Sequence, residues 1–426
     1  MRILLEPGSY TCLNLGDVAM MQMAVTRLSS LWPDTRIQII TESPDLLAGL
    51  CPEAVPIPVA GKRAWLQTRI LGRFHRSLRY TLGNRADIAD AALRHRMPGM
   101  ATRLLAWKMR VRNLDFADVS SFLDAFLNAD LVVVSGSGAI ADPFCDRALQ
   151  LMETLAMAHQ LKIPSVMFSQ GLGPVDSARL VSAMKQVLPD IRQIGVRESM
   201  RSPGLLTSAG VAPARICEAG DDALEMALDH ASGGLGNAIG VNLRMTAYSG
   251  LTSDLIPALR TALSQAAHQY QAVLIPLPIL RRNDEDLRAT RSVLPEAHIF
   301  SASTDADTPC KAIRLTSCCR IVITSSYHAA VFALGQGIPT IGLVRSQYYA
   351  NKFEGLREQF AEGCRIVEIG NHGFADHLSQ AIEWAWHSAP AIRTAIVQTT
   401  RNLVSSSQRA YSQLPELLSG APRQVA

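Results

Sequence analysis

The chain of 426 residues has no run of about 18 uncharged apolar residues, which is roughly what a membrane-spanning helix needs. Its first segment, MRILLEPGSY, reaches Glu6 after only a short apolar stretch, so it does not look like a secretory signal. Eight cysteines are scattered without a C-x-x-C pair, which argues against a zinc site and against a disulfide framework. We therefore expect a protein of the reducing cytoplasm.

Several motifs that would reveal a cofactor or a nucleic-acid partner are also absent. An apolar run at residues 131–134, LVVV, is followed by the turn Ser135-Gly136-Ser137-Gly138. This turn lets a ligand approach the backbone, but it lacks the third glycine of a dinucleotide fingerprint and the lysine of a P-loop. No group of His, Cys, Asp and Glu residues has metal-ligand spacing, and no nucleic-acid motif is recognised. We predict no metal site, no resident cofactor and no nucleic-acid partner.

The length and the pattern of apolar residues predict two α/β domains. A chain of 426 residues is too long for one ordinary core, and a hydrophobic content of 48% fits a well-packed globular protein. Short apolar strands alternate with amphipathic helices along most of the chain. Residues 232–237, SGGLGN, form the best linker. We predict an N-terminal domain at 1–232, a C-terminal domain at 237–375 and C-terminal helices at 376–426.

A strongly basic segment interrupts this alternation at residues 61–112. It has thirteen Lys or Arg residues against two acids, while the rest of the chain carries a net charge of −7. Apolar residues recur at helical spacing from Leu66 to Leu82 among arginines at 63, 69, 73, 76 and 79, and Trp107 stands on a second helical stretch. Such a pattern is typical of a helix on an anionic membrane. An Arg-rich helix packed on its own domain is the alternative.

Residues 321–344, IVITSSYHAAVFALGQGIPTIGLV, predict a compact strand–helix–strand unit. A strand is followed by the polar turn Ser325-Ser326 and by a helix that opens near His328 and closes at Gly335 and Gly337. Open α/β sheets bind ligands at this end of a strand, because backbone N–H groups and the helix dipole point there. His328 is therefore a candidate acid or base. A histidine that only hydrogen-bonds the backbone is the alternative.

Other polar or glycine residues also stand where strands are predicted to end, and a two-lobed fold would bring these ends to a central cleft. They are Asn14, Asp17, Gly171, Arg197 and Arg244. Asp17 could instead cap the helix predicted at residues 18–31. A buried ion pair with Glu198 or an aspartate is the structural alternative for Arg197.

The order and spacing of these elements resemble the polysaccharide pyruvyl transferase family. The resemblance covers most of the chain except residues 61–112 and the last few dozen. Many members have Arg where this chain has Ser326, and the aspartate after Gly220 is often followed by Pro, where this chain has Asp222. The matching motifs are Asn14-x-Gly16-Asp17, Gly136 with Gly138, Gly171-x-Gly173-Pro174, Val196-Arg197-Glu198-Ser199 with Gly210, Gly220-Asp221, Gly240-Val241-Asn242-x-Arg244, Ser325-x-x-His328 through Phe332-Ala333, Gly337-Ile338-Pro339 and Lys352.

Members of that family transfer the enolpyruvyl group of phosphoenolpyruvate to sugar hydroxyls, usually as a cyclic ketal, on a two-domain fold like that of GT-B glycosyltransferases. The resemblance thus implies two Rossmann-like domains, a phosphoenolpyruvate donor and a polysaccharide or lipid-linked oligosaccharide acceptor. It implies His328 as the acid/base, with a pKa near neutrality, and Arg197, Arg244 and Lys352 as anchors for phosphate and carboxylate. The remaining expected substrate-binding positions are Ser325, Ser326, Asn14, Asp17, Gly136, Gly138 and Gly171.

Two other functions stay open. A nucleotide-sugar-dependent glycosyltransferase would share the fold, and Glu354 and Glu362 have a spacing seen in some of those enzymes. They follow Gly337-Ile338-Pro339, however, whereas that pair would be expected before it. An inactive glycan- or lipid-binding protein would fit Ser326 in place of Arg, although retention of His328 and three cations argues against it. The preferred prediction is a cytoplasmic transferase with peripheral contact at the inner membrane face through residues 61–112.

Overall fold

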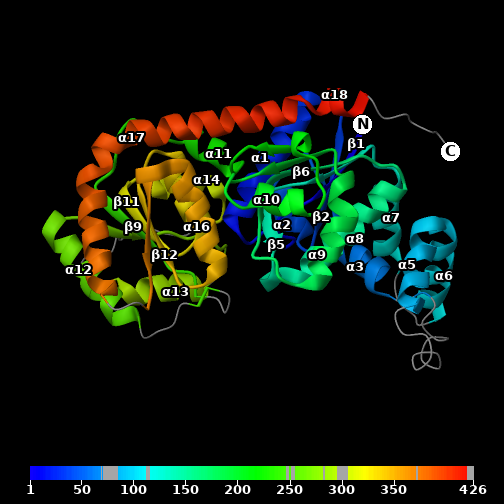
Figure 1. The fold of residues 1–426 in the computed structure, drawn as a ribbon, viewed down its shortest axis with the longest axis horizontal. Coiled ribbons are helices and arrows are strands. Elements are labelled where there is room, and N and C mark those ends of the chain that lie inside the picture. Colours follow the sequence, from blue (N-terminus) through cyan, green and yellow to red (C-terminus); the bar gives the residue numbers. More distant parts are fainter. Residues whose placement is uncertain are drawn as a thin grey trace.

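A computed structural model of the chain describes residues 1–68, 70, 85–111, 116–245, 249–250, 255–281, 284–294, 306–370 and 373–419. Arg69, Arg73, Arg76 and Arg79 of the predicted basic helix lie outside these ranges. The described residues form two parallel sheets with helices packed around them, so the predicted α/β class with two Rossmann-like units is confirmed (Figure 1).

The first sheet contains eight strands, of which seven run in the order β3-β2-β1-β4-β6-β7-β8 while β5 pairs with β6. In β1, Ile3 and Leu5 belong to one buried cluster and Leu4 to another, so both faces of the sheet are covered. A parallel sheet buried on both faces needs apolar residues at nearly every strand position, which explains runs such as LVVV. The strands are β1 Arg2–Glu6, β2 Arg36–Thr41, β3 Val55–Pro58, β4 Leu131–Val134, β5 Ser137–Ile140, β6 Ser165–Leu172, β7 Gln193–Val196 and β8 Ile216–Glu218.

The helices of the first lobe connect these strands. The first of them begins three residues earlier than predicted, because Asn14 caps it: the Asn14 side chain accepts hydrogen bonds from the backbone N–H groups of Gly16 and Asp17. The expectation that Asp17 caps this helix was therefore wrong. The helices are α1 Leu15–Leu31, α2 Pro44–Leu50, α3 Val59–Gln67, α5 Arg85–Arg96, α6 Pro98–Val111, α7 Ala117–Leu127, α8 Cys145–Gln160, α9 Ala178–Val187, α10 Ser202–Ser208 and α11 Ala223–Asp229.

The second sheet has five parallel strands in the order β10-β9-β11-β12-β13. The predicted strand–helix–strand unit is confirmed as β11, α15 and β12, and all nine residues of α15 are buried. The strands are β9 Ala238–Asn242, β10 Val273–Pro276, β11 Cys319–Thr324, β12 Thr340–Val344 and β13 Cys364–Glu368. The helices are α12 Ile256–Tyr270, α13 Asp284–Val293, α14 Pro309–Thr316, α15 Tyr327–Gly335 and α16 Gln347–Phe360.

One long helix, α17 (Phe374–Ser412), spans both lobes and is followed by α18 (Leu414–Ser419). Figure 1 shows it running from the second lobe along the top of the molecule to the first. Its first half packs Leu378 and Trp386 into the core of the second lobe, and its last turns pack Ala410 and Tyr411 into that of the first. The chain therefore returns to the first lobe after completing the second.

The order of strands places a ligand-binding crevice in each sheet. In the first sheet the connections reverse direction between β1 and β4, and in the second between β9 and β11. Loops at the carboxyl ends of strands diverge at such a point and leave a crevice. The lobes also join there, since the N–H of Leu15 donates to the carbonyl of Ile279 (2.8 Å) and that of Arg281 to the carbonyl of Leu13 (2.8 Å).

Candidate active site

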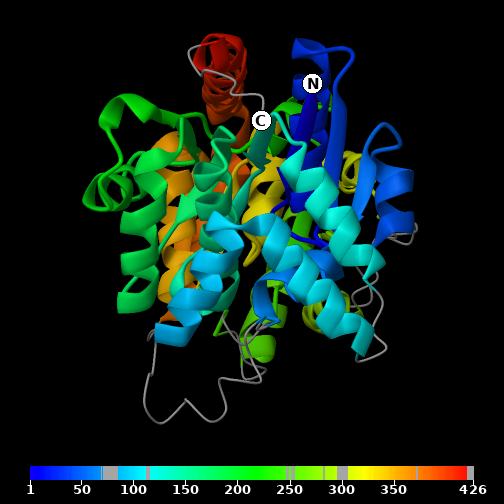
Figure 2. The same ribbon diagram turned by 90° about the vertical axis from the view of Figure 1, so that its right-hand side faces the viewer.

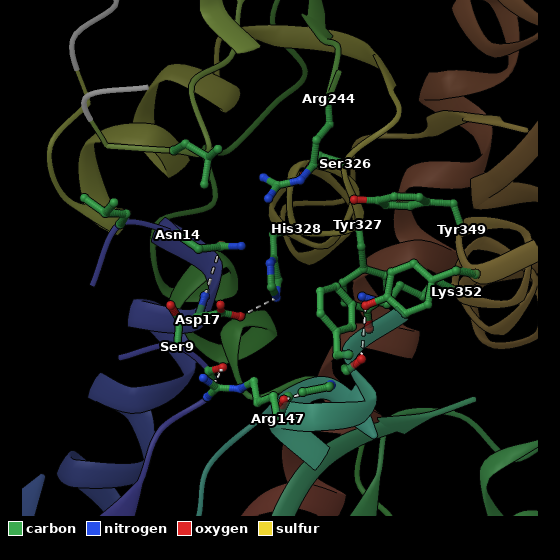
Figure 3. A pocket seen from close by; sticks show the side chains of 18 of the residues that line it. Ser9, Asn14, Asp17, Arg147, Arg244, Ser326, Tyr327, His328, Tyr349 and Lys352 are labelled. Carbon is green, nitrogen blue, oxygen red and sulfur yellow. Dashed lines mark hydrogen bonds and ion pairs between the residues drawn. The ribbon is translucent and has the colours of Figure 1, made fainter. Parts of the chain in front are cut away.

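A cavity of about 340 Å³ lies where the two crevices meet (Figure 3). The first lobe contributes Ser9, Asn14 and Asp17 after β1 and Gly138 after β4. Arg244, Ser326, Tyr327 and His328 follow β9 and β11 of the second lobe, and Tyr348, Tyr349 and Lys352 come from α16. Elements far apart in the sequence thus converge on one site.

His328 stands in the first turn of α15 with 6% of its surface exposed. Its Nε2 atom lies 3.9 Å from Asp17 Oδ1 and 3.9 Å from Asp221 Oδ2, and it has no hydrogen-bond partner among the described residues. Burial lowers the pKa of His328 well below its ordinary value, and the charges of Arg197, Lys352 and Arg244 lower it further. This direction differs from the expected pKa near neutrality, and it favours the neutral imidazole, which can accept a proton.

Gly16, the second residue of α1, allows a close contact between this helix and His328. A Cβ atom at Gly16 would lie 2.0 Å from Cγ of His328, so only glycine lets α1 approach the imidazole this closely. The approach brings the carboxylate of Asp17 to the ring. Burial raises the pKa of Asp17, while Arg197 and Lys352 oppose that shift.

The guanidinium of Arg197 is held mainly by contacts with neighbouring residues of the protein. Its Nε–H donates to the carbonyl of Ser169 (2.7 Å), and the same nitrogen lies 3.1 Å from Asp221 Oδ2. The guanidinium also lies over the ring of Tyr327. The sequence-based alternative of a buried ion pair with an aspartate is thus realised, and the partner is Asp221 rather than Glu198. Arg197 still borders the cavity and contributes its charge there.

Lys352 and Arg244 are the other two predicted cations at the cavity. The ammonium of Lys352 lies among aromatic rings, 4.3 Å from the centroid of Tyr348 and 5.4 Å from that of Tyr327. Burial lowers the pKa of Lys352 to about 7, with a further contribution from the charge of Arg197. Arg244 approaches Asp286, with 3.5 Å between Nη1 and Oδ2.

Three of the predicted residues lie beside the cavity and do not line it. The hydroxyl of Ser325 accepts a hydrogen bond from the backbone N–H of Arg244 (2.7 Å), which aligns the ends of β9 and β11. Gly136 packs against Met20, where a Cβ atom would lie 2.0 Å from the sulfur. Gly171 lines a smaller neighbouring pocket behind Arg197.

The sequence interpretation missed a fourth cation and an aromatic wall. Arg147 on α8 donates to the carbonyls of Pro7 (2.9 Å) and Gly8 (2.7 Å), which directs it to the cavity. Phe144, Tyr348 and Tyr349 line the cavity from α16 and the segment before α8. The run YYANKF, which contains Lys352, was the one available signal for the tyrosines. No motif marks Arg147.

The described residues contain no group of three or more His, Cys, Asp and Glu side chains placed to hold a metal ion. Four cationic side chains and one carboxylate line the cavity: Arg147, Arg197, Arg244 and Lys352 against Asp17. The first turn of α15 also faces the cavity without a side-chain cap, and free backbone N–H groups at a helix N-terminus attract anions. The charge of this lining favours an anionic ligand.

Comparison with solved structures supports the two-lobed description. A Listeria monocytogenes protein assigned as a UDP-N-acetylglucosamine 2-epimerase matches with a TM-score of 0.60 and 10% identity, over 100% of this chain and 99% of the other. The UDP-GlcNAc 2-epimerase of Neisseria meningitidis gives 0.57 and 12%, over 98% and 100%. A glycosyltransferase of Rickettsia africae gives 0.55 and 13%, over 99% of each chain. No curated protein matches the chain.

Two facing Rossmann-like lobes with a polar cavity between the carboxyl ends of their sheets define a protein of the GT-B type. Within this class the family can be stated as well. The chain belongs to the polysaccharide pyruvyl transferase family, whose model matches residues 14–347. That range runs from the cap of α1 to the first residue of α16, and so includes most of the cavity. Its family makes the protein a transferase.

Proposed function

We propose that the protein transfers the pyruvyl group of phosphoenolpyruvate to sugar hydroxyls of a polysaccharide or its lipid-linked precursor, with His328 as the acid/base. The observation that carries this proposal is a buried imidazole in a cavity lined by four basic side chains and one carboxylate. Phosphoenolpyruvate is small and carries a phosphate and a carboxylate, so its charge complements this lining.

The arrangement of the cations suits a donor with two anionic groups. In Figure 3, Arg244 and Arg147 lie on opposite sides of the pair formed by Asp17 and His328. One anionic group would bind toward Arg244 and the N-terminus of α15, and the other toward Arg147. The reacting carbons between them would then face the imidazole. Arg197, compensated by Asp221, would orient the donor rather than supply most of the binding charge.

The proton balance of the reaction assigns two steps to one histidine. His328 accepts the proton of the first sugar hydroxyl as its oxygen bonds to C2, and the imidazolium returns that proton to C3, which becomes a methyl group. Asp17, 3.9 Å away, stabilises the imidazolium. A second hydroxyl then displaces phosphate from C2, and its proton leaves with the phosphate. The products are a cyclic ketal and inorganic phosphate.

Calorimetric titration of phosphoenolpyruvate tests the donor. We expect saturable binding to the wild-type protein, and Arg244→Ala should weaken it by about 1.5–3 kcal/mol because a charged hydrogen bond is lost. Arg409→Ala is the control. Arg409 lies exposed on α17, and its side chain donates a hydrogen bond to the neighbouring Ser406 (2.8 Å).

Two results would contradict the proposal. Binding of a nucleotide sugar without binding of phosphoenolpyruvate would favour the glycosyltransferase alternative. The glutamates considered for that function lie elsewhere: Glu354 pairs with Arg201, Glu362 lies near Arg365, and neither lines the cavity. Silence toward both donors, with a glycan acceptor present, would favour a binding protein without transferase activity.

A further inference from the structure

Helix α6 presents an apolar stripe to solvent. Five large apolar residues are exposed along this helix and the residue before it: Met97 (52%), Met100 (43%), Leu104 (38%), Trp107 (66%) and Val111 (63%). Their spacing alternates between three and four residues, so they lie on one face of the helix. A soluble surface rarely keeps so many large apolar side chains in a row, which indicates that this face has a partner.

The stripe is separate from the face that holds α6 to the protein. Ala101, Leu105 and Met109 recur every four residues, are buried, and belong to the main core of the first lobe. The packing of α6 is therefore complete without the stripe. Figures 1 and 2 show α5 and α6 at the end of the molecule that lies away from the second lobe.

A row of arginines runs beside the stripe. Arg103 and Arg110 are exposed and stand seven residues apart on α6, which places them along one line of the helix surface, and Arg96 at the end of α5 is exposed as well. Residues 98–111 contain no Asp or Glu. An apolar row with a cationic row next to it is complementary to an anionic bilayer surface, where apolar side chains enter the acyl boundary and arginines meet lipid phosphates.

Other basic residues of the segment are committed to the fold. Lys62 is buried and its Nζ atom lies 2.7 Å from Glu6 Oε1, Arg63 pairs with Glu42, and Arg94 pairs with Asp90 (2.9 Å). Trp65 is fully buried. For α3 the packed-helix alternative is therefore realised, and among the described residues of the segment α6 is the helix that offers a surface to a partner.

We propose that the outer face of α6 docks the protein on an anionic phospholipid bilayer. This proposal does not depend on which donor substrate the protein uses, because no residue of the stripe lines the cavity. A second copy of the chain is the less favourable occupant, since pairing two stripes would bring two arginine rows side by side. Docking here would hold a transferase near a lipid-linked acceptor.

Co-sedimentation with vesicles tests the proposal on the full chain. We expect binding to vesicles of phosphatidylcholine with phosphatidylglycerol, little binding to phosphatidylcholine alone, and release at high salt. Leu104→Glu should weaken the partition about tenfold or more, because an apolar contact is replaced by a repelled charge. Arg103→Gln should weaken it about fivefold. Val273→Glu is the control, since Val273 is 42% exposed in the second lobe.

Fluorescence provides a second readout. Emission of Trp107 should shift to shorter wavelength when anionic vesicles are added, and the shift should vanish in Trp107→Phe. Unweakened binding of Leu104→Glu, or no binding to anionic vesicles by a folded wild-type protein, would overturn the proposal. So would a wild-type dimer that Leu104→Glu converts to monomers by light scattering, because the stripe would then be covered by a second copy.

Discussion

Lys352 shows how a single residue of the cavity is tuned by its surroundings. Burial lowers its pKa to about 7, so near neutral pH only part of the free protein carries the charge. A bound phosphate or carboxylate favours the ammonium form and raises that pKa again. Above about pH 7, binding of phosphoenolpyruvate should therefore take up a proton, and affinity should fall as the pH rises.

Calorimetry in buffers of different ionisation enthalpy measures this proton uptake. Lys352→Arg is the informative variant, because its guanidinium stays charged throughout this range. It should bind the donor with no pH dependence around 7 and with less proton uptake. If the wild-type protein and Lys352→Arg release or take up the same number of protons, Lys352 is not the titrating group.

The role proposed for His328 predicts a loss of turnover without a loss of donor binding. His328→Gln keeps a polar side chain of similar reach but cannot relay the proton, and the rate should fall about 10²–10⁴-fold. Steady-state rates of phosphate release check this, with calorimetry on the same variant. A variant that binds the donor and retains turnover would exclude His328 as the acid/base.

At the scale of elements, the close contact between α1 and α15 predicts a large effect of a very small change. In Gly16→Ala the added methyl group would overlap the His328 ring, so one of the two helices must move. Overpacking of this kind costs about 1–3 kcal/mol in unfolding free energy and should also impair turnover.

Gly49→Ala on α2 is the matched control for this prediction, because nothing lies within 4 Å of a Cβ atom there. It should leave activity unchanged and raise stability by roughly 0.5–1 kcal/mol, as expected when alanine replaces glycine inside a helix. Wild-type stability and turnover in Gly16→Ala would show that the two helices do not pack as described.

Local patterns were enough to predict most elements and the ends of strands that meet at the cavity. The buried run at 321–324 and the helix opening near His328 carry strong apolar signals, and both are present. The start of α1 was misplaced because Asn14 and Asp17 are both good caps, and only the backbone decides between them. Arg147 and Phe144 could not be found, since their place at the cavity depends on packing between distant segments.

At the scale of the whole molecule, α17 runs from the second lobe to the first, and a buried polar network holds its last turns to the first lobe. Arg27 on α1 lies 2.6 Å from Asp222 just before α11, and it also donates to Ser407 of α17 (2.7 Å). Tyr411 of α17 donates to the other oxygen of Asp222 (2.9 Å) and stacks on Phe168. One carboxylate thereby connects three helices. Because α11 also packs on α15, the network supports both sides of the cavity.

Arg27→Ala should therefore weaken the whole fold. It leaves Asp222, whose side chain is fully buried, without its ionic partner, and breaking a buried pair costs about 3–5 kcal/mol. Denaturant unfolding followed by circular dichroism should show a lower midpoint, and we expect a single transition because α17 packs into the cores of both lobes. Arg409→Ala, an exposed arginine of the same long helix, should change stability by no more than about 0.5 kcal/mol. Two separated transitions in the wild-type protein would show that the lobes unfold independently. If Arg27→Ala and Arg409→Ala changed the unfolding free energy equally, the network would contribute nothing to stability.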